Sequence, residues 1–258
     1  NISSASMIAF QWKANGGTTT SNSASGDIKA SVTQRDDTAK FAICTYTGTG
    51  INAGQSHRVN HGLGTTPHVM LFKSRGATGD WVVYHHKNTS APETDYLVLN
   101  SNAATVDSAN KFNDTAPTTS YATIGGDDNI SSGTMILYSF AEVQGYSKFG
   151  SYEGNYNVDG PFIYTGFKPA FVMVKEADNA NDWDLRDNAR DPNNHVDTWL
   201  RPNTTDQDGD SDAWDFLSNG FKIRQASNRN NRSGGTMIYM AFAEQPFVSS
   251  EGVPCTAR

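Results

Sequence analysis

Residues 132–142 read SGTMILYSFAE, and residues 234–244 read GGTMIYMAFAE. Met135 and Met237 occupy the same place in the two stretches and are 102 residues apart (237 − 135). In each stretch a glycine is followed by an apolar and aromatic run of the length of one strand. A strand motif that recurs at a fixed spacing indicates an internal duplication.

The duplication extends upstream at the same spacing. Gly64, Pro67, Lys73 and Trp81 correspond in this way to Gly166, Pro169, Lys175 and Trp183. Residues 41–48 match residues 147–154 as well, with Tyr46 and Tyr152 separated by 106 residues (152 − 46). The difference between the two spacings falls in a Gly/Asn-rich connection, and connections of this kind tolerate insertions.

The repeat predicts how the chain is divided. The predicted parts, in chain order, are the terminal strand of a preceding β unit (1–13), a connector or short hairpin (14–39), β unit one (40–145), β unit two (146–248) and a C-terminal tail (249–258). The first part is assigned because Met7 and Ile8 align with the repeated strand motif. The chain begins at Asn1 without an initiator methionine or a signal-peptide pattern, so we expect it to be the later part of a longer polypeptide.

Composition favours strands over helices. Charged residues make up 18% of the chain, below the roughly 25% of an average soluble protein, and aromatic residues reach 11%. No segment shows a sustained period of 3.6 residues, whereas short apolar runs alternate with Gly-, Asn- and Ser-rich turns. The predicted fold class is therefore all-β, with tandem duplicated antiparallel β-sandwich units of a jelly-roll-like type.

Charge and hydropathy exclude two classes of partner. A net charge of −7 disfavours nucleic acid, whose binding needs clustered lysine and arginine. The longest apolar stretches, such as residues 169–174, fall far short of the roughly 20 residues of a membrane helix, so we expect no membrane insertion. Cys44 and Cys255 fit no metal-ligand spacing, and two unpaired thiols are favoured over a disulfide.

Catalytic residues are not predicted. His57, His61, His68, His85 and His86 lie in unit one and His195 in unit two, without metal-binding spacing, so strand-edge and loop roles are favoured. Asp182, Asp184, Asp187 and Asp191 surround Arg186 and are interpreted as a solvated ion-pair loop. Glu142 and Glu244 occupy equivalent repeat positions, which indicates a structural role rather than glycosidase chemistry. We therefore expect a protein that is not an enzyme.

One acidic loop is a candidate calcium site. Asp206, Asp208, Asp210 and Asp212 stand at alternate positions and could surround a hard cation with oxygen ligands. The loop departs from the EF-hand pattern, because Ser211 stands where that pattern has glycine. An acidic loop without a ligand is thus the favoured interpretation, and no other cofactor is predicted.

Tryptophans are the candidate ligand-binding residues. Trp81 and Trp183 are repeat-equivalent and lie in predicted strands, so they are expected to pack in a core. Trp199 and Trp214 occur in unit two alone, beside Asn- and Asp-rich loops, and are the candidates for stacking against a sugar.

Several motifs together carry a resemblance. They are Tyr-Thr-Gly (46–48), Asn-His-Gly-Leu-Gly-x-x-Pro (60–67), Trp-x-x-Tyr-His (81–85), Gly-Tyr-Ser-Lys-Phe-Gly-Ser-Tyr (145–152), Asp-Gly-Pro-Phe-Ile-Tyr-Thr-Gly-Phe-Lys-Pro (159–169), Asp-Asn-Ala-Arg (187–190) and Phe-Leu-Ser-Asn-Gly-Phe-Lys (216–222). With these motifs the chain resembles, over about residues 5–248, a family of tailed-bacteriophage virion proteins of the marine and cyanobacterial type. In that family a concanavalin- or laminin-G-like sandwich often precedes this region. The resemblance implies a virion component, usually of the tail or fibre, and supplies no catalytic residues.

The expected function follows from the resemblance and the strand-rich scaffold. We expect a virion structural protein, a tail fibre or receptor-binding component that contacts a host surface glycan or protein. Its other expected partners are further virion proteins and itself, as a homo-oligomer with a trimer favoured. The first alternative is a capsid decoration or head-fibre protein on the capsid surface. The second is a carbohydrate-binding module or a polysaccharide depolymerase.

Overall fold

The computed structural model describes residues 8–14, 17–50 and 52–244. Unit one contains β1 (Thr20–Asn22), β2 (Ile28–Lys29), β3 (Ser31–Asp36), β4 (Phe41–Thr49), β5 (His57–Asn60), β6 (Val69–Ser74), β7 (Val82–His85), β8 (Asp95–Val98), β9 (Val106–Asp107), α1 (Ala109–Phe112), β10 (Tyr121–Ile124), α2 (Asp128–Ser131) and β11 (Ser132–Phe140). An eight-stranded sheet in the order β1-β3-β4-β11-β6-β7-β8-β9 faces a three-stranded sheet in the order β10-β5-β2. The paired strands are antiparallel except for β2 and β5.

Unit two repeats this plan. It contains β12 (Ser147–Glu153), β13 (Phe162–Tyr164), β14 (Pro169–Glu176), β15 (Asp184–Asp187), β16 (Val196–Trp199), β17 (Gly209–Leu217), β18 (Gly220–Ile223) and β19 (Thr236–Ala243). The order β12-β19-β14-β15 in one sheet matches β4-β11-β6-β7 of unit one, and the second sheet has the order β13-β18-β17-β16. The predicted all-β class with antiparallel sandwich units is confirmed.

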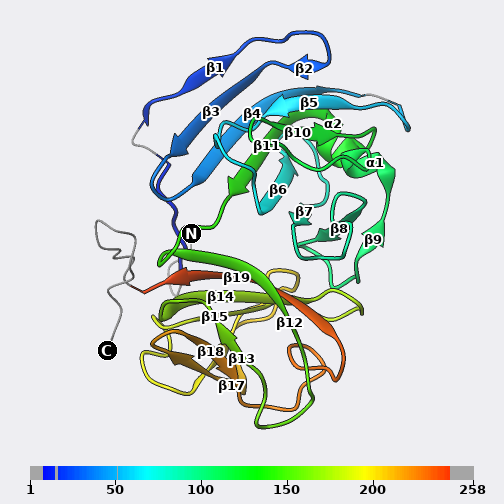
Figure 1. Cartoon of the computed structure of the whole chain (residues 1–258). Helices are drawn as coiled ribbons and strands as arrows, with labels where there is room; N and C mark the ends of the chain where they lie inside the picture. The colour runs from blue at the N-terminus through cyan, green and yellow to red at the C-terminus, as the bar shows by residue number, and fades with distance from the viewer. Residues whose placement is uncertain (1–7, 15–16, 51, 245–258) are drawn as a thin grey trace.

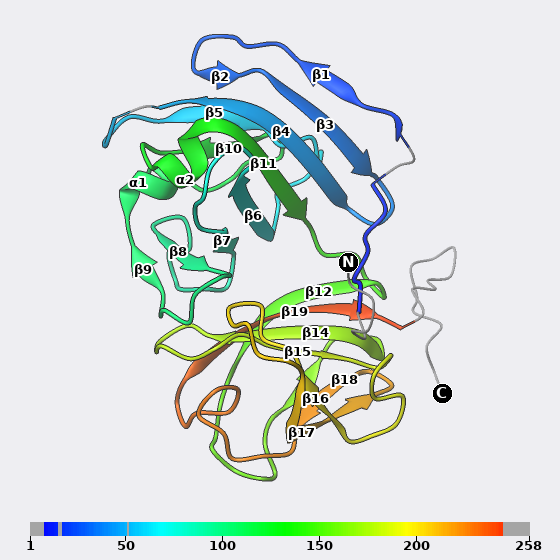
Figure 2. The same cartoon turned by 180° about the vertical axis from the view of Figure 1, so that it is seen from behind.

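The two units stack, so that the molecule has four sheet layers (Figures 1 and 2). Along β19, Met237, Tyr239 and Ala241 point into the core of unit two, while Ile238, Met240 and Phe242 point toward unit one. Successive side chains of a strand face opposite sides of its sheet, and here both sides are buried. This explains why the repeated strand motifs read as continuous apolar runs rather than as an alternating pattern.

Hydrogen bonds join the two units across the core between them. His85 Nε2 lies 3.0 Å from the carbonyl oxygen of Tyr239, and His86 Nε2 lies 2.8 Å from that of Phe149. Trp183 Nε1 donates to the carbonyl of Val98 at 3.0 Å. The units therefore share one apolar interface, across which these three polar side chains form hydrogen bonds.

The N-terminal part differs from the expected connector. Residues 20–36 form β1, β2 and β3, which extend both sheets of unit one. The described residues 8–14 form no strand, and Met7 lies outside the described residues. Phe10 and Trp12 instead pack into the core between the units, with ring centroids 5.0 Å from Phe171 for Phe10 and 5.2 Å from Phe242 for Trp12. In the part of the chain that the structure describes, no helix is long and apolar enough to cross a membrane.

Candidate functional site

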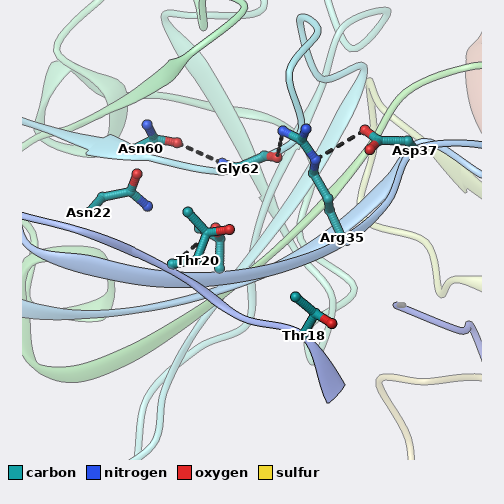
Figure 3. A pocket seen from close by; sticks show the side chains of 8 residues that line it. Thr18, Thr20, Asn22, Arg35, Asp37, Asn60 and Gly62 are labelled. Atoms are coloured by element: carbon teal, nitrogen blue, oxygen red, sulfur yellow. Dashed lines mark hydrogen bonds and ion pairs between the residues drawn. The ribbon is translucent and has the colours of Figure 1, made fainter. Parts of the chain in front are cut away.

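A polar pocket of about 350 Å³ opens between β1, β3 and the turn that follows β5 (Figure 3). Thr20 pairs with Thr33 and Asn22 pairs with Ser31 across the two strands. Asn22 Nδ2 donates to Ser31 Oγ at 3.3 Å, and Ser31 Oγ donates to the carbonyl of Asn60 at 3.1 Å. The pocket wall formed by the strands is thus tied directly to the end of β5.

The turn after β5 forms the opposite wall. Asn60 Oδ1 accepts the amide of Gly62 at 2.9 Å, and the buried His61 ring accepts the amide of Leu63 at Nδ1, 3.1 Å away. Gly62 has a φ of +75°, and a Cβ there would lie 2.5 Å from Cβ of Thr33. Only glycine fits this position, because it supplies the left-handed backbone and lets the turn approach β3.

Arg35 and Asp37 close one end of the pocket. Arg35 Nη1 donates to the carbonyl of Gly62 at 3.1 Å, and Arg35 Nε lies 3.0 Å from Asp37 Oδ1. Both side chains are exposed, at 47% and 66%. They are the charged side chains among the described residues that line the pocket, and their charges offset each other.

Sequence reasoning missed this pocket. Its lining comes from residues 18–37 and 60–62, which only strand pairing brings together. The available signal was the Asn-His-Gly-Leu-Gly turn at residues 60–64, which unit two does not repeat. The chemistry of the pocket is that of neutral hydrogen bonding, with hydroxyl and amide groups predominating.

The comparisons place the chain in a family. A protein-family model described as a domain of unknown function, DUF7483, matches residues 1–246. The chain belongs to this family. No curated protein and no solved structure gives a significant match. The family assignment covers both units as well as the strands that build the pocket.

The predicted calcium loop lies at the surface of unit two. Asp206 and Asp208 are more than half exposed, and the nearest cations are Arg201, 3.8 Å from Asp206, and Arg190, 3.9 Å from Asp208. Asp210 is exposed at the start of β17, and the side chain of Asp212 lies outside the described part of the structure. Among the described residues, no three His, Cys, Asp or Glu side chains gather as metal ligands.

The two candidate tryptophans have different environments. Trp214 is fully buried, with Phe221 stacked at a centroid distance of 5.7 Å and the Arg186 guanidinium 5.1 Å from its ring. Its expected position at the surface is wrong, since β17 turns this ring into the core of unit two. Trp199 is half-buried and packs against Gly209, and Arg201 lies 3.7 Å from its ring centroid. Trp199 therefore has one face occupied by a cation.

The expected solvated ion-pair loop around Arg186 is also wrong. Asp184 and Arg186 are both 0% exposed, and Arg186 Nε donates to Asp184 Oδ1 at 2.8 Å. The pairing of β16 with β17 is irregular between Val196 and Thr198. Arg186 Nη1 donates to the carbonyls of Val196, Asp197 and Ser211 beside this irregularity. The guanidinium can be buried because Asp184 and these carbonyls accept its hydrogen bonds.

The remaining candidates have structural contacts. His68, His85 and His86 lie together at the interface between the units, and the ring centroids of His68 and His86 are 4.5 Å apart. Glu142 accepts the amide of Phe149 at 2.9 Å and pairs with Lys148, so it ties β11 to β12. Glu244 pairs with Lys168 and accepts from Asn188. Cys44 is a buried free thiol whose pKa is raised to about 12 by burial, and Cys255 lies outside the described residues.

Proposed function

We propose that this chain is a structural component of a tailed-bacteriophage virion, a tail fibre or receptor-binding protein that presents the polar pocket to the host surface. The proposal joins the motif resemblance to the architecture. Four stacked sheets with a shared apolar core make a densely packed scaffold, and densely packed elements resist local opening. Such a scaffold is suited to hold a binding site outside a cell.

One observation carries the proposal. The Asn-His-Gly-Leu-Gly-x-x-Pro motif at residues 60–67, which is part of the resemblance, builds a wall of the polar pocket. Its Gly62 is fixed by a close approach to Thr33 rather than by packing in the core. A turn constrained in this way at an open pocket is the kind of loop that carries binding function.

Self-association and binding to other virion proteins are part of the proposal. An open apolar groove of about 500 Å³ runs beside the interface between the units, and Trp12, Phe41, Trp81 and Tyr138 contribute to it. Trp12, Trp81 and Tyr138 are partly exposed there, and apolar surface of this kind is often covered in an assembly. A closed homo-oligomer, with a trimer favoured, would cover it symmetrically.

Cryo-electron microscopy of the phage particle that carries this chain tests the proposal. Density for the four-layer molecule at the tail periphery supports host recognition. Density on the capsid lattice contradicts it and favours a capsid decoration or head-fibre protein. Light scattering of the purified chain measures its oligomeric state separately, and a monomer at all concentrations contradicts the proposed trimer.

A further inference from the structure

We propose that the pocket between β1, β3 and the turn after β5 binds one neutral sugar residue of a cell-surface polysaccharide. This inference rests on the proposed function, because a host surface would supply that ligand. A volume of about 350 Å³ lies at the small end of the range for ligand pockets and suits one sugar or a disaccharide.

Several hydrogen-bonding groups of the pocket remain available to a ligand. Asn22 uses its Nδ2, and Asn60 uses its Oδ1, in bonds within the pocket walls. Their other amide atoms, and the hydroxyl groups of Thr18 and Thr20, make no hydrogen bond with the described residues. The lining side chains (Figure 3) therefore offer both donors and acceptors, which the vicinal hydroxyl groups of a sugar require.

The charges of the pocket favour a neutral ligand. The positive charge of Arg35 is offset by Asp37 at 3.0 Å, so the pocket gives little attraction to phosphate, sulfate or an acidic sugar. One carboxylate that is paired with an arginine, among hydroxyl and amide groups, is also a poor set of ligands for a divalent cation. A neutral ligand with many hydroxyl groups matches what the pocket offers.

Unit two differs from unit one at the position of Gly62. At the 102-residue spacing, Tyr164 stands where unit one has Gly62, and it is 65% exposed. Among the described residues, unit two has no strands corresponding to β1 and β3, and β12 pairs there with β19 alone. The pocket thus occurs in one of the two units, together with the glycine that its wall needs. The equivalent position of unit two, where the described residues provide no such strands, carries Tyr164 in place of this glycine.

Saturation-transfer NMR with the purified full chain tests the inference. The probes are methyl glycosides of glucose, galactose, mannose and rhamnose, and N-acetylglucosamine and N-acetylgalactosamine. The pocket variant combines Thr20→Val with Asn22→Ala, and Asp37→Asn is a second variant at the exposed rim. Ser21→Ala is the matched control, because Ser21 is exposed on the same strand but points away from the pocket.

We expect transfer to at least one of these sugars, with an affinity reduced about three- to tenfold or more by the pocket variants and unchanged by the control. No transfer to any of them, or transfer that all variants retain, overturns the inference. Circular dichroism checks that each variant is folded. If the double variant does not fold, the affinity of Asp37→Asn tests the inference. The result is distinguishable from the virion location, since sugar binding by the purified chain does not depend on where the particle carries it.

Discussion

Two equivalent positions show how differently the units use one fold. In unit one, Val82 and Tyr84 of β7 point into the sandwich core, whereas unit two has Asp184 and Arg186 of β15 at the same register against β14. All four side chains are buried. Unit two accepts an ion pair there because its outer sheet is irregular and presents carbonyls to the guanidinium. A buried charge is tolerated where every hydrogen-bonding group finds a partner.

At the sheet edges, unit one carries the additional feature. Unit one gains β1 and β3 beside β4, and with them the polar pocket. In unit two the corresponding strand β12 is left at the edge of its sheet. The distinctive feature of unit two is therefore an ion pair in its core, whereas that of unit one is an open pocket at the edge of its sheet. The duplicated sheets that face each other stay apolar in both units because each covers the other.

Breaking the buried ion pair should have the largest effect. We expect Arg186→Met to lower the free energy of unfolding by about 3–5 kcal/mol, because Asp184 would stay buried without a cation and nearby carbonyls would lose their donor. Urea unfolding of the full chain measures this. The matched control is Arg58→Met, which removes an exposed arginine that pairs with Asp27 and should change stability far less. Equal losses for the two variants would contradict the role assigned to Arg186.

Acidification should weaken the interface between the units. His85 Nδ1 accepts the amide of Lys87 and its Nε2 faces the carbonyl of Tyr239, so a second proton would break a bond. Burial, with a smaller contribution from nearby His86 and His68, lowers the pKa of His85 to about 3. In the unfolded chain this histidine takes up its proton near pH 6.5, and the unfolded state then binds more protons.

The free energy of unfolding should therefore stay level above about pH 6.5 and fall by about 1.4 kcal/mol per pH unit for this histidine as the pH drops toward 3. Urea unfolding over a pH series measures the slope. His85→Gln should reduce the slope, whereas His57→Gln, on β5 in the outer sheet, should leave most of it. A stability that does not change between pH 7 and 4 would contradict the assignment.

The close approach at the pocket wall gives a smaller effect. Gly62→Ala should destabilise the chain by about 2–4 kcal/mol, since it adds a clash with Thr33 to the strain of a positive φ. Gly234→Ala is the matched control, because Gly234 has a φ of +68° and no atom within 4 Å of the added Cβ. It should cost only about 1–2 kcal/mol. Thermal unfolding compares the two, and equal shifts in Tm would show that β3 does not restrain the turn.

The sequence predicted the features that a fixed spacing encodes. The repeated strand around Met135 and Met237 revealed the duplication, and its apolar run became a strand buried on both faces. The burial of Arg186 could not be predicted, because it depends on an irregular pairing of β16 with β17. Trp214 was misplaced because residues near acidic loops are usually exposed, whereas β17 turns this ring into the core of unit two.

The pocket escaped prediction for another physical reason. Residues 20–36 hold few large apolar side chains, so their strands are stabilised by pairing with β4 and β5 rather than by a hydrophobic pattern. Asn22 and Asn60 are far apart in the chain, and the segment around each has the composition of an ordinary turn. Only the register of β1 with β3, and of Ser31 with the end of β5, brings them to one opening.

Calcium should have the smallest effect, and it bears on whether unit two has a surface site of its own. The loop with Asp206 and Asp208 has no counterpart in unit one, and both carboxylates are more than half exposed beside arginines. Because these carboxylates face cations already and are not gathered around one point, we expect added calcium to leave Tm unchanged. Differential scanning fluorimetry with calcium and with a chelator measures this, and Asp208→Asn provides the control. A calcium-dependent rise in Tm that Asp208→Asn abolishes would show that the loop binds the ion, and unit two would then carry a surface site in addition to its buried ion pair.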